Sequence, residues 1–195
     1  MSLFAPRGPA DIAALIGEHP LAWVVSGLPG FLATPLPLIA EVSEDGSVVA
    51  LVGHFSLRNP QVAALRAAPH ALILFQGAQG YISPGLVTQP QWAPTWNYAV
   101  VRFQVEIVFA PEDNTEALDR LIAHVEQDSP SRWTTAQMCE RYEPMLQQIV
   151  AFRASVLACD ATFKLGQDER PETFAQILGG HSDAALVEAM ERARV

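Results

Sequence analysis

The stretch Tyr98–Phe109 reads YAVVRFQVEIVF and decides the fold class of this chain. It is rich in β-branched and aromatic residues, and its apolar positions partly alternate with polar ones, which is typical of a strand. Shorter runs of the same character precede and follow it, separated by glycine, proline and other turn residues. Strands are predicted in the ranges 21–26, 31–42, 48–54, 71–75, 81–82, 98–109 and 152–163. This much strand excludes an all-helical fold and favours an antiparallel meander.

Helical patterns lie between and after these strands. Asn59-Pro60 places a capping residue before a proline at the first helical position, and Asp113-x-x-Glu116 reads as a capping box. Ser182 is predicted to cap the last helix. Helices are predicted in about the ranges 11–18, 60–68, 114–127, 142–149, 171–178 and 183–194. The chain therefore reads as α+β, mainly β, with peripheral helices.

Length and composition favour one domain over residues 1–195, with C-terminal helices from about residue 171. The chain is 50% hydrophobic and 17% charged, which is too apolar for disorder, yet no apolar run reaches the roughly 18–20 residues of a membrane span. The N-terminal residues lack a signal-peptide pattern, so we expect a cytoplasmic protein. Cys139 and Cys159 lie far apart and form no Cys-x-x-Cys pair, so we expect two buried thiols.

Charge argues against direct nucleic-acid binding. Twelve Lys and Arg residues oppose 21 Asp and Glu residues, which gives a formal net charge of −9 and a pI near 4.9. A nucleic-acid surface normally needs a basic stripe that neutralises phosphates, and the cationic residues here are scattered. Only one of them is a lysine, Lys164.

Four stretches at predicted strand ends and turns combine amides, hydroxyls, aromatic rings and cations. This mixture suits a planar heteroaromatic ring that carries a phosphate. The four stretches cover residues 54–60 (HFSLRNP), 76–84 (QGAQGYISP), 94–98 (PTWNY) and 163–168 (FKLGQD).

The first stretch makes the clearest physical case for an anion site. A strand carrying His54 and Ser56 leads into a helix that begins near Asn59. Free backbone N–H groups, the helix dipole and the Arg58 guanidinium are therefore expected to converge on a phosphate. The alternative is that Asn59 is only a helix cap and Arg58 only a solvated charge.

The other stretches are less specific. Residues 94–98 present Thr95, Trp96 and Asn97 to a ring edge, or form a strand entry whose aromatic residues belong to the core. Residues 76–84 read as a glycine-hinged hairpin, whose glycines admit a ligand or simply turn the chain. Lys164 follows a strand and is either a point charge for a phosphate or carboxylate, or a surface lysine. Neither a catalytic triad nor metal-ligand spacing is apparent in the sequence.

Taken together and in this order, the four stretches resemble the PaiB-like "FMN-binding negative transcriptional regulator" family, with Pro20-Leu21-Ala22 and Leu36-Pro37-Leu38 fitting as well. The resemblance covers roughly residues 1–180 and implies a split β-barrel of antiparallel strands related to pyridoxamine-phosphate oxidases. It also implies a homodimer with FMN held between protomers. The residues expected to bind the cofactor are His54, Ser56, Arg58, Asn59, Gln76, Tyr81, Ser83, Thr95, Trp96, Asn97, Lys164 and Gln167.

Several positions depart from the family pattern. Ser83-Pro84 is followed by Gly85-Leu86-Val87 where the family has Ser-Trp-Tyr, so an aromatic wall is missing. The family's Lys-Leu-Ser-Gln-Asn becomes Lys164-Leu165-Gly166-Gln167-Asp168, which loses a hydroxyl and gains a carboxylate. An Asp beside a phosphate is unfavourable unless a cation compensates it.

Three functions follow from these observations. The leading hypothesis is an FMN-dependent oxidoreductase of unknown small-molecule substrate, in which the cofactor carries the redox chemistry. The second is a ligand-responsive regulator that acts without direct DNA contact, since neither the charge nor any helix-turn-helix favours DNA binding. The third is a haem-binding protein on the same barrel, with His54, His70 or His124 as candidate axial ligands.

Overall fold

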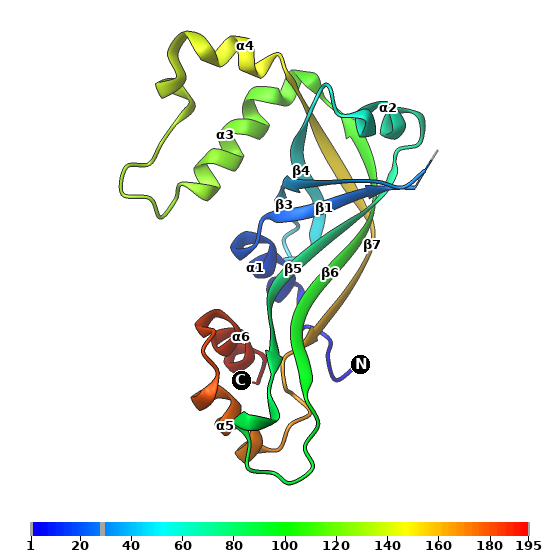
Figure 1. Cartoon of the computed structure of the whole chain (residues 1–195). Helices are drawn as coiled ribbons and strands as arrows, with labels where there is room; N and C mark the ends of the chain where they lie inside the picture. Colours follow the sequence, from blue (N-terminus) through cyan, green and yellow to red (C-terminus); the bar gives the residue numbers. More distant parts are fainter. Residues whose placement is uncertain (1, 28–29, 195) are drawn as a thin grey trace.

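A computed structural model describes residues 2–27 and 30–194 and shows an elongated molecule built on one long sheet (Figure 1). The sheet has seven strands in the order β2-β1-β5-β6-β7-β4-β3, and every neighbouring pair is antiparallel. The strands are β1 (Leu21–Ser26), β2 (Leu32–Pro37), β3 (Ile39–Val42), β4 (Val48–Ser56), β5 (His70–Ile82), β6 (Thr95–Phe109) and β7 (Ile149–Lys164). The predicted antiparallel, mainly β fold is confirmed.

The two edges of the sheet are joined by the chain itself. Strand β2 pairs with β1 at one edge, β3 pairs with β4 at the other, and only Leu38 separates them. Leu38 is fully buried and donates its backbone N–H to Pro20 O at 2.9 Å. The sheet therefore curls so that its edges meet at this residue without a ladder between β2 and β3, as in a split barrel.

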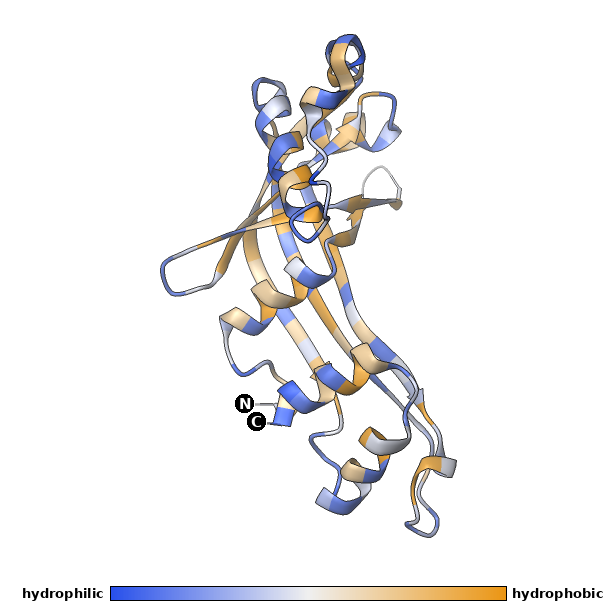
Figure 2. Ribbon diagram, turned by 90° about the vertical axis from the view of Figure 1, so that its left-hand side faces the viewer, coloured by the Kyte–Doolittle hydropathy of each residue, from blue (hydrophilic) through white to orange (hydrophobic). Residues whose placement is uncertain are grey.

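The core lies on the concave face of the sheet. The largest fully buried side chains include Phe55, Phe75, Phe103 and Phe152, which come from β4, β5, β6 and β7. Figure 2 shows this concentration of apolar residues along the strands, while the helices carry both kinds of residue. The alternation along β6, in which odd-numbered residues from Asn97 to Ile107 are buried, is the half-buried pattern that its sequence predicts.

Within the described residues, six α-helices pack against the sheet or extend from its ends, with three 3-10 turns between elements. The helices are α1 (Pro9–Glu18), α2 (Pro60–Ala67), α3 (Asn114–Val125), α4 (Tyr142–Leu146), α5 (Pro171–Gly180) and α6 (Ala184–Arg194). Asn59 caps α2 as predicted, since its Oδ1 accepts the Gln61 N–H at 2.9 Å. No described helix combines the length and apolarity that crossing a membrane would require.

Several local predictions were wrong. Asp113 makes no capping hydrogen bond with its side chain, and the last helix is capped by Asp183, whose Oδ1 accepts the N–H groups of Ala185 and Leu186, rather than by Ser182. Both cysteines are exposed, Cys139 at a kink with φ of 49° inside the 3-10 segment Thr135–Arg141 and Cys159 on β7. The predicted helix 142–149 ends at Leu146, because the chain enters β7 at Ile149.

The most consequential correction concerns β5. The glycine-rich run 76–80 was predicted to be the turn of a hairpin, but it lies inside one continuous strand, His70–Ile82. Its pairing with β6 shifts there, since Gln76 faces Val100 and Gln79 faces Tyr98, so β5 contains one extra residue in a β-bulge. The bulge is what arranges the candidate site described next.

Candidate functional site

An exposed aromatic pair lies where β5 ends and β6 begins, and these strand ends are at the bottom of the sheet in Figure 1. Tyr81 and Trp96 face each other across the two strands with ring centroids 5.9 Å apart, and they are 48% and 50% exposed. Large aromatic side chains are usually buried, so a half-exposed pair on a strand surface is unusual and suits a flat ligand. We call Gln79, Tyr81, Thr95, Trp96 and Lys164 the aromatic cluster.

The β-bulge at Gly77-Ala78 puts this cluster on the open face of the sheet. Beyond the bulge the alternation of β5 is shifted by one residue, so Gln79 and Tyr81 point outward while Gly80 points inward. Gly77 and Gly80 are needed on the inner side, because a Cβ there would lie 2.9 Å from Leu15 of α1 and 2.8 Å from Leu186 of α6. The glycines therefore serve helix packing, and the same bulge aims the polar and aromatic side chains.

Lys164 joins the cluster from the end of β7. Its Nζ donates to Thr95 Oγ1 and to the Trp96 carbonyl oxygen, the second at 3.1 Å. No carboxylate pairs with it within residues 2–27 and 30–194. An ammonium group with three N–H donors thus retains its charge and one donor for a ligand.

Other predicted residues near this end have structural partners. Gln167 accepts the Leu165 N–H at 2.7 Å and donates to Phe163 O at 2.6 Å, so its amide holds the turn after β7. Ser83 Oγ accepts the Gly85 N–H, and Gln76 is exposed one row above the bulge. Asn97 lies on the opposite face, 2% exposed beneath α6, where its Nδ2 is 3.5 Å from the sulfur of Met190. Asn97 is therefore separated from the aromatic cluster by the sheet.

The second group of predicted residues lies where β4 leads into α2, and we call Ser56, Arg58 and Asn59 the α2 corner. The expectation that free N–H groups converge here was wrong. The backbone N–H groups of Leu57, Arg58, Asn59, Gln61 and Val62 all donate to acceptors of the chain itself, at 2.9–3.3 Å. The Asn59 side chain is also engaged, since its Nδ2 donates to Thr34 Oγ1. What remains for an anion is the exposed Arg58 guanidinium and the Ser56 hydroxyl.

His54 lies two residues before the corner and is half-buried. Burial lowers the pKa of its imidazole, and its Nδ1 is buried with no hydrogen-bond partner in the described residues. The imidazole is therefore held neutral near pH 7. The other two histidines considered for haem lie on different elements: His70 is exposed at the start of β5, and His124 Nε2 is 2.9 Å from Gly17 O.

The two groups are far apart in one chain. Ser56 pairs with Ile149 at the first end of β7, whereas Lys164 lies at its other end. The run between them corresponds to about 50 Å of strand at roughly 3.3 Å per residue. One chain therefore does not bring the twelve predicted residues together, because a single FMN cannot touch both ends of β7.

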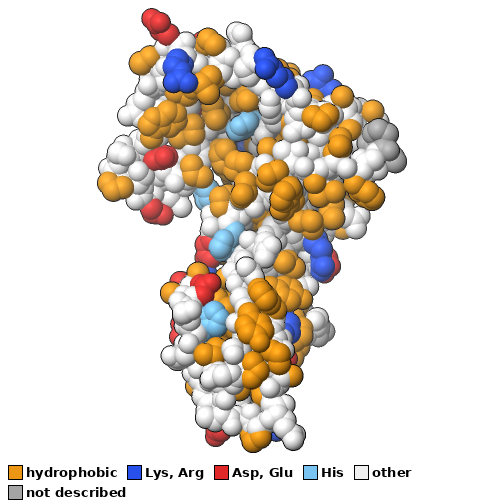
Figure 3. Space-filling model, in the orientation of Figure 1, with side chains coloured by type: hydrophobic (Ala, Val, Ile, Leu, Met, Phe, Trp, Pro, Cys, Tyr) orange, Lys and Arg blue, Asp and Glu red, His pale blue; other side chains and the backbone are white. Residues whose placement is uncertain are grey.

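The face of the sheet between these groups is open and carries exposed apolar side chains beside polar and charged ones. A row of cross-strand neighbours runs Trp23, Leu74, Arg102, Asp160 over β1, β5, β6 and β7, and we call this side the outer face. Leu21 and Trp23 on it are 62% and 51% exposed. Figure 3 shows hydrophobic side chains gathered over β1 and its neighbours, and again lower down over β5 and β6. A surface of this kind marks an interaction site more often than free solvent.

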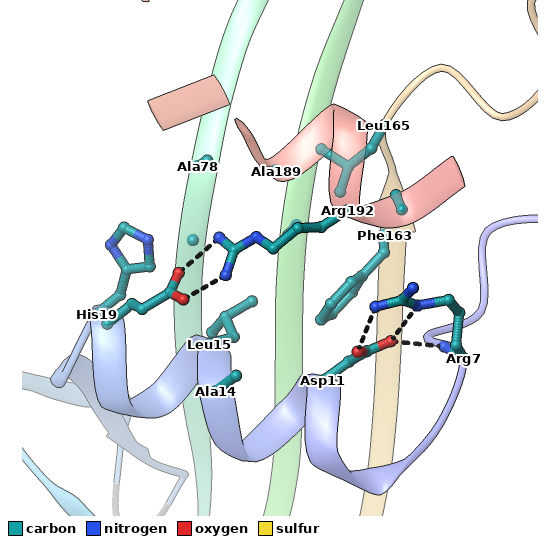
Figure 4. A pocket seen from close by; sticks show the side chains of 14 residues that line it. Arg7, Asp11, Ala14, Leu15, His19, Ala78, Phe163, Leu165, Ala189 and Arg192 are labelled. Atoms are coloured by element: carbon teal, nitrogen blue, oxygen red, sulfur yellow. Dashed lines mark hydrogen bonds and ion pairs between the residues drawn. The ribbon is translucent and has the colours of Figure 1, made fainter. Parts of the chain in front are cut away.

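A small hollow that no sequence pattern predicted lies between α1, α6 and the sheet (Figure 4). Its volume is about 70 Å³, and its floor includes Leu15, Ala78 and Phe163. Two ion pairs bound it, Arg7 with Asp11 at 3.2 Å and Arg192 with Glu18 at 2.9 Å. Both guanidinium groups already pair with carboxylates. We therefore interpret the hollow as part of the packing contact between α6 and α1 and not as an anion site.

Fold and site together define a split-barrel protein whose exposed surface suits a flat ring and an anionic group. The chain belongs to the family described as "Putative FMN-binding domain", whose model matches residues 2–158. The expected resemblance to the PaiB-like family and the expectation of FMN as cofactor are thereby confirmed.

Individual proteins agree with this assignment. The chain is 29% identical over 150 residues to the "Protease synthase and sporulation protein PAI 2" of Bacillus subtilis (strain 168), covering 75% of this chain and 70% of that protein. The solved structure of the FAD and heme binding protein from Mycobacterium smegmatis matches with a TM-score of 0.59 and 18% identity, covering 88% of this chain and 77% of that one. A conserved hypothetical protein from Mycobacterium tuberculosis matches with a TM-score of 0.58 and 15% identity, covering 88% and 92%. At these identities the two structures support the fold alone.

Proposed function

We propose that the protein is a cytoplasmic, homodimeric FMN-dependent oxidoreductase, in which each cofactor lies between the aromatic cluster of one copy and the α2 corner of the other. The observation that carries the proposal is the separation of the two groups along β7. Bound FMN supplies hydride and electron transfer at its ring, and the residues of the chain bind and orient it.

A two-fold axis perpendicular to the strands satisfies both groups at once. This axis stacks the outer faces of two copies with their strands running in opposite directions. The α2 corner of one copy then lies against the aromatic cluster of the other. The exposed Leu21 and Trp23 are then covered, which removes their cost in water. The Arg58 guanidinium of one copy holds the phosphate, while Tyr81, Trp96 and Lys164 of the other hold the ring.

The donor chemistry of the chain fits this cofactor. Arg58 and Lys164 lack carboxylate partners in the part of the chain that the structure describes, so their charges are available to an anion. The aromatic pair supplies a face for a flat ring. The sequence contains no feature that identifies the substrate beyond a small molecule able to reach the ring.

The first experiment is an absorbance spectrum of the purified protein followed by an FMN titration. Two flavin bands and saturable binding support the proposal. A Soret band instead would support the haem-binding alternative, which the similarity to the FAD and heme binding protein of Mycobacterium smegmatis motivates. Binding of neither group would favour a regulatory role, in line with the name of the Bacillus subtilis relative.

A mixing experiment tests the shared site directly. Arg58→Ala alters the α2 corner and Lys164→Met alters the aromatic cluster. Each variant alone should therefore bind FMN weakly, because both sites of its dimer contain an altered group. After subunit exchange, a mixed dimer regains one intact site, and about a quarter of all sites should bind FMN with wild-type affinity. If mixing restores no binding, each site is built within one chain and the proposal is wrong.

A further inference from the structure

Gln79 is a member of the aromatic cluster to which sequence analysis assigned no role. It lies on β5 directly after the bulge, and its Oε1 accepts the Trp96 indole N–H at 2.6 Å. Both side chains are exposed on the outer side of the sheet. A short hydrogen bond between two exposed side chains is of interest because water competes for both partners.

The bond fixes the orientation of the Gln79 amide. An indole N–H can only donate, so the atom that faces Trp96 must be the carbonyl oxygen of the amide. The Nε2 group then points away from the indole with two N–H donors, and it makes no hydrogen bond to the described residues. Gln79 therefore locks the Trp96 ring and also presents donors beside it.

The neighbouring polar groups of the cluster are donors as well. Lys164 gives two of its three N–H groups to Thr95 and Trp96, which leaves one free. The Thr95 hydroxyl accepts from Lys164 and keeps its own proton for another acceptor. Beside the two aromatic faces the cluster thus offers hydrogen-bond donors, so a fitting ligand has an edge rich in acceptors. The carbonyl oxygens and unprotonated nitrogens of an oxidised flavin ring form such an edge.

We propose that Gln79 is a positioning residue for the cofactor ring, which holds the Trp96 indole in place with its carbonyl oxygen and donates from its amide nitrogen to an acceptor on the ring edge. The proposal rests on the proposed function, since it requires FMN at the aromatic cluster. It also explains the β-bulge, because without the extra residue Ala78 would face Tyr98 and Gln79 would point into the core.

Two substitutions separate the two tasks of this side chain. Gln79→Met keeps the length of the side chain but removes the strong acceptor and both donors. Gln79→Glu keeps an acceptor for the indole and removes the donors. Gln147→Met, at an exposed glutamine beyond α4, is the matched control.

The first readout needs no cofactor. The ¹⁵N-labelled indole signal of Trp96, identified by its loss in Trp96→Phe, reports the hydrogen bond through its shift and its rate of exchange with solvent. We expect the bond to be lost in Gln79→Met and kept in Gln79→Glu and Gln147→Met. The second readout is the FMN dissociation constant, with visible circular dichroism as a measure of the orientation of the bound ring.

We expect both Gln79 variants to bind FMN about fivefold to tenfold more weakly than the wild type, and only Gln79→Met to change the flavin circular dichroism. Wild-type affinity in both variants would overturn the proposal while leaving FMN binding intact. If the wild type itself fails to bind FMN, the proposed function falls and this proposal with it, and the spectrum and titration show which case holds. Unchanged melting temperatures confirm that the exposed substitutions leave the fold intact.

Discussion

Arg102 and Asp160 form an ion pair on the outer face, with 2.5 Å between Arg102 Nη2 and Asp160 Oδ2. They lie in the same cross-strand row as the exposed Trp23. The Arg102 Nε is buried and has no hydrogen-bond partner in the described residues. An ion pair beside a large, half-exposed tryptophan on an open sheet face is more typical of an interface than of a free surface.

We therefore predict that the protein is a dimer in solution and that Trp23→Glu separates it into monomers, because a carboxylate in the middle of an apolar interface is costly. Sedimentation velocity at micromolar concentration measures this. Trp133→Glu, at an exposed tryptophan outside the sheet, should remain dimeric. A single wild-type species near the chain mass of 21.2 kDa would contradict the prediction.

Arg58→Ala should lower FMN affinity at least tenfold. The guanidinium is exposed, and a charge-assisted phosphate contact contributes about 1.5–3 kcal/mol. Because the N–H groups of the corner are already used, the loss of Arg58 cannot be compensated by the backbone. Arg132→Ala removes an exposed arginine elsewhere and should leave the titration unchanged. Equal affinities for both variants would make Arg58 a surface charge only.

The sequence predicted most strands and helices because their signals are local. The alternation of 98–109 and the Asn59 cap depend on neighbouring residues alone. The β-bulge could not be predicted in this way. Gly77 and Gly80 owe their identity to Leu15 and Leu186, which lie far away in the sequence, and a glycine-rich run without that knowledge reads as a turn.

The candidate site was predicted in part for the same reason. Residue types indicated the chemistry of the aromatic cluster and of Arg58, since aromatic and cationic residues can be read from the sequence, but their exposure could not be. The sequence could not show that Asn97 faces the opposite side of the sheet, or that the Gln167 amide is used by the turn after β7. The sequence motifs also contain no information about the distance between the aromatic cluster and the α2 corner.

Replacing glycine by alanine should change the free energy of unfolding in opposite directions at two positions. A Cβ at Gly53 would lie 2.4 Å from Leu38 and 3.2 Å from the Pro37 carbonyl oxygen, so Gly53→Ala should destabilise the protein by about 1–3 kcal/mol. Gly179, near the end of α5, has open space around it, and Gly179→Ala should be neutral or stabilising by up to about 1 kcal/mol. Urea unfolding measures both. Equal changes in the free energy of unfolding would show that Leu38 does not pack against Gly53 where the two edges of the sheet meet.

The burial of His54 predicts a loss of stability on the acid side. Its pKa in the folded protein is lowered below the ordinary value of 6.5 by burial, so above that pH both folded and unfolded chains hold it neutral. As the pH falls below 6.5, the unfolded chain takes up a proton that the folded chain resists, and the free energy of unfolding decreases. His54→Gln should flatten this decrease between pH 6.5 and the lowered pKa. An unchanged slope would show that His54 is solvated.

The last prediction concerns Asp168, where the family pattern has Asn. Asp168 is exposed in the turn that follows Lys164, closed by the Glu169 N–H bonded to Gly166 O at 3.1 Å. Its carboxylate forms no ion pair in the described residues, so its charge acts on whatever lies near Lys164. In the proposed dimer the acceptor-rich edge of the flavin ring lies beside Lys164, so Asp168→Asn removes a negative charge near that edge and should tighten FMN binding about fivefold, which corresponds to roughly 1 kcal/mol.

Salt separates this charge effect from a change in packing. The gain from Asp168→Asn should shrink as ionic strength rises, because the Debye length falls from about 10 Å at 0.1 M to about 3 Å at 1 M. The control is Asp128→Asn, which changes an exposed carboxylate beyond α3 and should leave FMN affinity unaltered at any salt concentration. Asp183 is not used as a control because its side chain caps α6. Weaker FMN binding by Asp168→Asn at low salt would mean that the carboxylate points away from the cofactor and supports the turn instead.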